Sequence, residues 1–73
     1  MKITVRPVGV VRRFAEDQTI VVRAGLNSRG LIRKLGIPHE LKMISFVNGT
    51  RVDLNEELKD GDEVRLVTLL TGG

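Results

Sequence analysis

The sequence predicts an α+β roll, in which a mixed sheet carries one short helix on one of its faces, in the order β-β-α-β-β-β. Three observations predict this class. Apolar and polar residues alternate with period two in residues 2–6 and 63–66, whereas residues 27–35 change to helical spacing. A helix that interrupts runs of strands can bury its apolar stripe only against the sheet. The long chain between the first and last strands allows these two to pair in parallel at the sheet centre.

The composition fits a single small folded domain. The chain has 73 residues, of which 41% are hydrophobic and 29% charged, so it is too apolar for a disordered tail and too short for a second core. We expect one domain over residues 1–70, followed by a flexible C-terminal tail over residues 71–73.

The first two strands are predicted to form a hairpin with a long loop. Residues 2–6 alternate so that Ile3 and Val5 point inward, and residues 19–23 are rich in β-branched side chains. The basic pair Arg12 and Arg13 falls in the loop between them, together with Phe14, where solvated side chains are the rule.

The helix is predicted to begin at Asn27 or Ser28, because either residue is a good N-cap. Gly36 followed by Pro38 signals its end. Gly30 inside the helix costs about 1 kcal/mol relative to alanine, so the helix is expected to depend on packing against the sheet.

Two turns organise the second half of the chain. Asn48-Gly49 stands between the apolar runs 43–47 and 50–52 and predicts a hairpin with a type I′ turn, with Phe46 in the core. Residues 54–58 are predicted to be an irregular crossing segment or a single turn. Residues 60–62, Asp-Gly-Asp, predict a second turn with a structural role before the last strand.

The last strand is predicted to point Val64 and Leu66 inward and Arg65, Val67 and Leu69 outward. Outward apolar residues beside the end of the chain suggest a contact surface, and scattered surface hydrophobics are the alternative interpretation. The predicted core gathers the inward positions of all elements: Ile3, Val5, Ile20, Val22, Leu31, Leu35, Ile44, Leu58, Val64 and Leu66.

Most self-contained chemistries are excluded. The chain has no cysteine and a single histidine, His39, which rules out a disulfide framework, a thiolate metal site and a cysteine nucleophile, and we expect no metal. His39 follows Pro38 at the helix exit and is predicted to be a surface residue. The sequence contains no phosphate-binding loop and no paired carboxylates that stand out as a catalytic dyad, so we expect that the chain is not an enzyme.

Charge and hydropathy argue against nucleic acid and membrane as partners of the chain. Twelve Lys and Arg against nine Asp and Glu give a formal charge of +3, but the basic residues are scattered and aromatics make up only 3%. A nucleic-acid-binding domain, which needs stacking platforms, therefore ranks last among the functions considered. No apolar run approaches the roughly 20 residues of a membrane span, and no signal-like segment opens the chain, so we expect a cytoplasmic protein without membrane contact.

Several motifs in the second half of the chain resemble those of a known family. Residues 58–64 read Leu-Lys-Asp-Gly-Asp-Glu-Val, a strand follows, the chain ends in Gly72-Gly73, and Val-Asn-Gly occupies residues 47–49. This combination resembles the ubiquitin-like sulfur carriers, namely the small subunit of molybdopterin synthase (MoaD), the thiamine-pathway carrier (ThiS) and the archaeal and eukaryotic ubiquitin-related modifiers. The resemblance covers essentially the whole chain by length and element order.

The resemblance implies a β-grasp fold and a carrier function. In such a protein, a separate ubiquitin-activating-like adenylyltransferase uses ATP to adenylate the carboxylate of Gly73, a sulfur donor converts it to a thiocarboxylate, and a synthase subunit accepts the sulfur. The carrier itself binds no cofactor and is expected to be a monomer when free. Gly72 belongs to the reactive tail, and the resemblance implies that Val67, Leu69, Leu70 and Thr71 contact the partners.

The residue types agree with this chemistry. A carboxylate is a poor electrophile, whereas an acyl-adenylate loses AMP readily, so attack by sulfur becomes feasible. Gly72 and Gly73 lack a Cβ, so the tail can enter a narrow channel and its terminal carbonyl is unshielded. The recipient pathway stays open between molybdopterin, thiamine and tRNA thiolation, and the alternatives to a carrier are a ubiquitin-like protein modifier or an interaction module with an inert tail.

Overall fold

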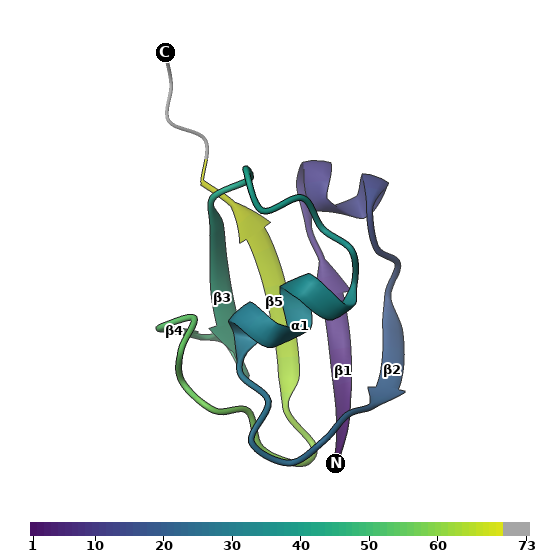
Figure 1. Cartoon of the computed structure of the whole chain (residues 1–73), viewed down its shortest axis with the longest axis vertical. Helices are drawn as coiled ribbons and strands as arrows, with labels where there is room; N and C mark the ends of the chain where they lie inside the picture. The colour runs from purple at the N-terminus through teal and green to yellow at the C-terminus, as the bar shows by residue number, and fades with distance from the viewer. Residues whose placement is uncertain (70–73) are drawn as a thin grey trace.

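A computed structural model describes residues 1–69, and in these residues a five-stranded sheet with the order β2-β1-β5-β3-β4 is crossed on one face by a single α-helix (Figure 1). The predicted α+β class and element order are confirmed, and the arrangement is that of a β-grasp fold. The elements in chain order are β1 (Lys2–Pro7), the 3-10 helix η1 (Gly9–Arg13), β2 (Gln18–Val21), α1 (Ser28–Lys34), β3 (Met43–Val47), β4 (Thr50–Val52) and β5 (Glu63–Thr68).

The first and last strands pair at the centre of the sheet. β1 and β5 are parallel, with Val5 opposite Val64, as the sequence predicts. β2 is antiparallel to β1, and β3 is antiparallel to both β5 and β4. Because β1 and β5 run in the same direction, the chain leaves β5 at the end of the sheet remote from the N-terminus (Figure 1).

Both ends of α1 use the predicted signals. The side chain of Asn27 accepts a hydrogen bond from the Gly30 amide at 2.8 Å, which caps the N-terminus. At the C-terminus Gly36 adopts φ +75°, its amide donates to the Arg33 carbonyl, and the Ile37 amide donates to the Ile32 carbonyl. This pair of bonds is a Schellman motif, which ends the helix.

Gly30 permits a close contact inside the domain. A Cβ at this position would lie 2.6 Å from Cδ1 of Leu26, and the Leu26 side chain is buried. The glycine that weakens the isolated helix therefore makes room for an apolar side chain of the core.

The face of β3 that meets α1 is not the predicted one. Ser45 is fully buried and its hydroxyl forms a 2.7 Å hydrogen bond with the hydroxyl of Ser28, the first residue of α1. Side chains alternate along a strand, so Ile44 and Phe46 lie on the opposite face and are half-buried. The prediction that these two residues belong to the core is wrong.

The remaining predicted core is largely confirmed. Leu31, Val64 and Leu66 are fully buried, and Ile20 and Leu35 are partly buried against the core. Four further predicted residues are buried, namely Ile3, Val5, Val22 and Leu58. The sequence does not identify the buried Val11, Ala15, Leu26, Ile32, Ile37 and Met43.

The two predicted turns are joined by a hydrogen-bonded cluster that fixes the start of β5. Asn48 and Gly49 both have positive φ, 52° and 88°, as a type I′ turn requires. The Asn48 amide group donates to Asp62 at 3.0 Å and its oxygen accepts from the Glu63 amide at 3.0 Å. The second carboxylate oxygen of Asp62 accepts from the Lys59 amide at 2.7 Å. The Asp-Gly-Asp turn thus has the structural role predicted for it.

Replacement of Asp62 by alanine is expected to destabilise the domain by about 1–3 kcal/mol, because two donors lose their acceptor at a largely buried position. Urea denaturation measures this loss. Asp60→Ala is the matched control, since the exposed Asp60 carboxylate accepts, within residues 1–69, only the Lys2 amide, and water can replace it. Equal losses in the two variants would contradict the structural role of Asp62.

Candidate functional site

The last strand divides its side chains between the two faces of the sheet. Val64 and Leu66 are fully buried beneath α1. Arg65 is exposed and Val67 is half-buried on the face that α1 does not cover. The predicted alternation is therefore confirmed, although Val67 is less exposed than expected.

Leu69 is the last residue that the structure describes. Its amide donates to the Lys42 carbonyl at 2.8 Å, and its side chain is 47% exposed. The predicted site residues Leu70, Thr71, Gly72 and Gly73 lie outside the described residues. The positions of Leu69 and Val67 therefore define where the chain approaches its C-terminus.

Two apolar side chains of β3 lie beside Val67 on the uncovered face. Ile44 of β3 is directly opposite Val67 of β5, and Phe46 is the next outward residue of β3. Phe46 lies between two arginines, because it pairs with Arg65 of β5 on one side and with Arg51 of β4 on the other. We call Ile44, Phe46 and Val67 the open-face cluster.

Sequence reasoning identifies only one member of the open-face cluster. It assigns Ile44 and Phe46 to the core, because burial of their apolar side chains is more favourable than burial of the polar Ser45. The signal that could have corrected this is the second serine, Ser28, at the start of the helix: two small hydroxyl residues can satisfy each other where a helix crosses a sheet closely.

Ion pairs neutralise one side of the uncovered face and not the other. The guanidinium of Arg6 in β1 donates to Glu63 at 3.1 Å and to Asp17 at 3.4 Å, and the hydrogen bond that the Glu63 carboxylate accepts raises the pKa of Arg6. Within residues 1–69, neither Arg65 nor Arg51 has a carboxylate within ion-pair distance. The two arginines that flank Phe46 therefore form no ion pair in the described part of the chain.

The other singled-out residues are on the surface. Arg12 and Arg13 are exposed in η1, where Arg12 lies 3.7 Å from Asp17, and the exposed imidazole of His39 lies 3.3 Å from Glu40. No three His, Asp or Glu side chains in the described part of the chain gather as metal ligands would. In residues 1–69 no helix has the length and apolar character that a membrane span requires.

Solved structures of similar proteins share this fold. A Pyrococcus furiosus protein provisionally named molybdopterin converting factor, subunit 1, matches with a TM-score of 0.75 and 26% identity, over 94% of this chain and 98% of that one. A chain of the complex of subunits 1 and 2 of molybdopterin-converting factor from Helicobacter pylori matches with a TM-score of 0.66 and 26% identity, over 100% of both chains. The thiamine biosynthesis protein ThiS from Geobacter metallireducens matches with a TM-score of 0.63 and 22% identity, again over 100% of both chains.

A comparison with curated proteins gives no match. The ThiS family model matches residues 5–73, which is nearly the whole chain and includes the terminal diglycine. The sequence resemblance to the sulfur carriers is thereby confirmed at the level of the family. The chain belongs to the ThiS family.

Proposed function

We propose that this chain is a sulfur carrier and not an enzyme, and that its reactive group is the C-terminal carboxylate of Gly73. Membership of the ThiS family supports this function. The observation that carries the proposal is the place where the chain leaves the sheet. The central strand β5 ends at Thr68, Leu69 is exposed, and residues 70–73 follow. At roughly 3.3 Å per extended residue, these residues can reach about 13 Å into a partner.

The chemistry divides between the carrier and its partners. In the activating enzyme, a carboxylate oxygen of Gly73 attacks the α-phosphorus of ATP and pyrophosphate leaves, which gives an acyl-adenylate. A sulfur nucleophile from the donor then attacks the acyl carbon and AMP leaves. The carrier contributes an unhindered acyl group, because neither Gly72 nor Gly73 places a Cβ beside the reacting carbon.

Mass spectrometry of the intact protein tests the proposal. After incubation with ATP, a sulfur donor and the cognate activating enzyme, the protein is expected to gain the mass of one exchange of oxygen for sulfur, located at Gly73. An interaction module with an inert tail would show no change in mass. A ubiquitin-like modifier would instead appear joined to the lysine of another protein through Gly73.

We further propose that the open-face cluster, with Leu69, Leu70 and Thr71, forms the surface that docks the activating enzyme and a sulfur-accepting synthase subunit. Half-exposed apolar side chains next to the exit of a reactive tail support this assignment. Arg51 and Arg65 add positive charge at the edge of the cluster. The Helicobacter pylori relative is found in a complex of two subunits, which supports a partner of this kind.

Val67→Asp is expected to weaken binding to the activating enzyme by about 2 kcal/mol or more, because a charge then replaces an apolar contact at the centre of the interface. Val21→Asp is the matched control: Val21 is also an outward valine, 72% exposed, but it lies on the edge strand β2. Titration calorimetry measures both affinities, and urea denaturation checks the fold. Equal weakening by the two variants would contradict the docking surface.

A further inference from the structure

Positive charge is concentrated around α1. Of the twelve basic residues of the chain, six line the two grooves that flank this helix, and none of the nine acidic residues lines either groove. The six residues are Arg23, Arg29, Arg33, Lys34, Lys42 and Arg51. Although the net charge is only +3, basic residues are therefore concentrated on one side of the molecule.

The larger groove lies between α1, the segment 36–42, β3 and β4, and has a volume of about 850 Å³. We call it the basic groove. Its cations are Arg29, Arg33, Lys42 and Arg51. Apolar side chains line it as well, among them Ile37, Leu41, Met43 and Leu54, and Leu69 also contributes to its wall. The groove thus combines apolar contact area with positive charge, next to the point where the chain approaches its C-terminus.

The cations of the basic groove have little internal compensation. In residues 1–69, no carboxylate lies within ion-pair distance of any of the four. Arg29 donates to the neutral amide oxygen of Asn55 at 3.0 Å. His39 also lines the groove and is paired with Glu40, a residue that does not line it. An anionic ligand would therefore meet several cations that form no ion pair within residues 1–69.

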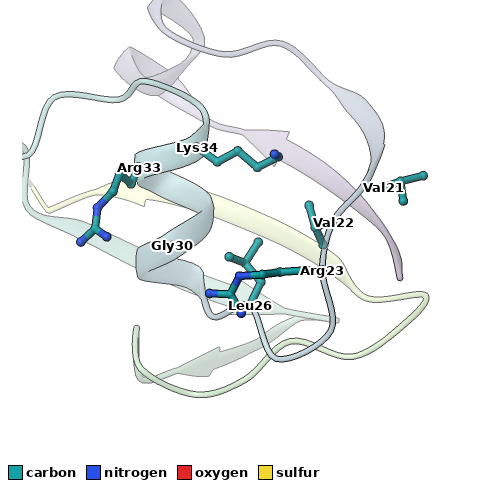
Figure 2. Close-up of a pocket in the computed structure, with 7 residues that line it drawn as sticks. All are labelled: Val21, Val22, Arg23, Leu26, Gly30, Arg33 and Lys34. Carbon is teal, nitrogen blue, oxygen red and sulfur yellow. The ribbon is translucent and has the colours of Figure 1, made fainter.

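The smaller groove continues the basic surface across the helix. Figure 2 shows Arg23 reaching from the segment after β2 toward Leu26, next to Gly30 of α1. Arg33 and Lys34 leave the helix on opposite sides in the same view, and Arg33 lines both grooves. Arg33 is thus shared by the two grooves on either side of α1.

We propose that the basic groove binds an acidic, amphipathic segment of a partner polypeptide. Its apolar side chains would cover Leu41, Leu54 and Leu69, and its carboxylates would pair with Arg33 and Lys42. A peptide fits better than a nucleic acid, because neither of the two phenylalanines of the chain, Phe14 and Phe46, lines the groove, whereas several aliphatic side chains do. The proposal does not depend on sulfur chemistry at the tail.

A random library of short peptides displayed on phage tests the proposal directly. Selection on the full chain is expected to enrich peptides that combine Asp or Glu with aliphatic residues. The most enriched peptide, made synthetically, is expected to bind the double variant Arg33→Glu, Lys42→Glu about tenfold or more weakly than the parent. The double variant Arg13→Glu, Lys59→Glu is the matched control, because it makes the same change of charge at exposed positions outside the groove.

Methyl NMR locates the bound peptide and completes the test. Methyl signals of Leu41, Leu54 and Leu69 are expected to shift on titration, also in a chain with an alanine appended after Gly73, where the proposed carrier function would be lost. Selection that enriches no acidic peptide, or equal weakening in the two double variants, would overturn the proposal. Tighter binding of a labelled oligothymidylate than of any selected peptide, lost on Arg33→Glu, Lys42→Glu, would assign the groove to nucleic acid instead.

Discussion

A chain that carries one alanine after Gly73 is expected to acquire no sulfur under conditions in which the parent is fully converted. The appended residue moves the terminal carboxylate by about 3.3 Å and places a Cβ next to the carbon that must react. Adenylation depends on holding the carboxylate oxygen in line with the α-phosphorus of ATP, and a displacement of this size removes that alignment. Mass spectrometry of the intact protein detects the loss.

Two further variants of the tail test whether conversion depends on the position of the terminal carboxylate or only on its presence. Deletion of Gly73 shortens the reach by about the same length and is expected to abolish conversion as completely as the extension does. Gly72→Val keeps the terminal carboxylate but restricts φ and adds bulk, so it is expected to slow conversion without preventing it. An extended chain that still gained sulfur, without being trimmed back to Gly73, would overturn the carrier mechanism.

These tail variants are expected to leave the fold unchanged. Every buried hydrophobic residue of the described chain lies between Ile3 and Leu66, so the core is complete before the tail begins. Urea denaturation should therefore give the parent midpoint for the extended, shortened and Gly72→Val proteins. A lowered midpoint would show that a loss of conversion reflects unfolding.

The local patterns that predict the fold correctly are those in which backbone chemistry leaves few choices. Asn48-Gly49 supplies the two positive φ angles of a type I′ turn, and Asn27 and Gly36 supply the two ends of the helix. The parallel pairing of β1 and β5 follows from the length of chain between them. The turn and the helix ends could be predicted because each depends on the properties of one short segment, and the parallel pairing because it requires only a long connection.

The face of β3 could not be predicted in the same way. Met43, Ile44, Phe46 and Val47 place apolar residues on both faces, so the alternation does not decide which face is inward. The decision comes from Ser45, whose hydroxyl meets that of Ser28 across the contact between helix and sheet. A long-range hydrogen bond between two segments leaves no periodic signal in either.

The inward position of Ser45 has a consequence for function. With Ser45 inward, Ile44 and Phe46 join Val67 on the uncovered face and form the open-face cluster beside the exit of the chain. The basic groove could not be predicted from the sequence for a similar reason. Its cations are scattered from residue 29 to residue 51, and only the fold brings Arg29 and Arg51 to one groove.

Leu66→Ala is expected to destabilise the domain by an amount near the upper end of about 2–5 kcal/mol. Leu66 is fully buried on the central strand β5, between Pro7 of β1 and Ser45 of β3 in the ladder. Both neighbouring strands are held by backbone hydrogen bonds, so the sheet cannot close around the cavity that the substitution leaves. The free energy of unfolding is therefore expected to decrease by the full cost of this cavity.

The size of the domain makes this loss decisive. Globular domains are stable by about 5–15 kcal/mol, and a chain of 73 residues is expected near the low end of that range, so Leu66→Ala removes much of the total. Leu69→Ala is the matched control, because it deletes the same atoms from a side chain that is 47% exposed and should change the stability by less than about 0.5 kcal/mol. Urea denaturation with an unchanged slope measures both variants. Equal midpoints for the two would mean that the inward face of β5 has been assigned incorrectly, and with it the orientation of Val67 toward the partners.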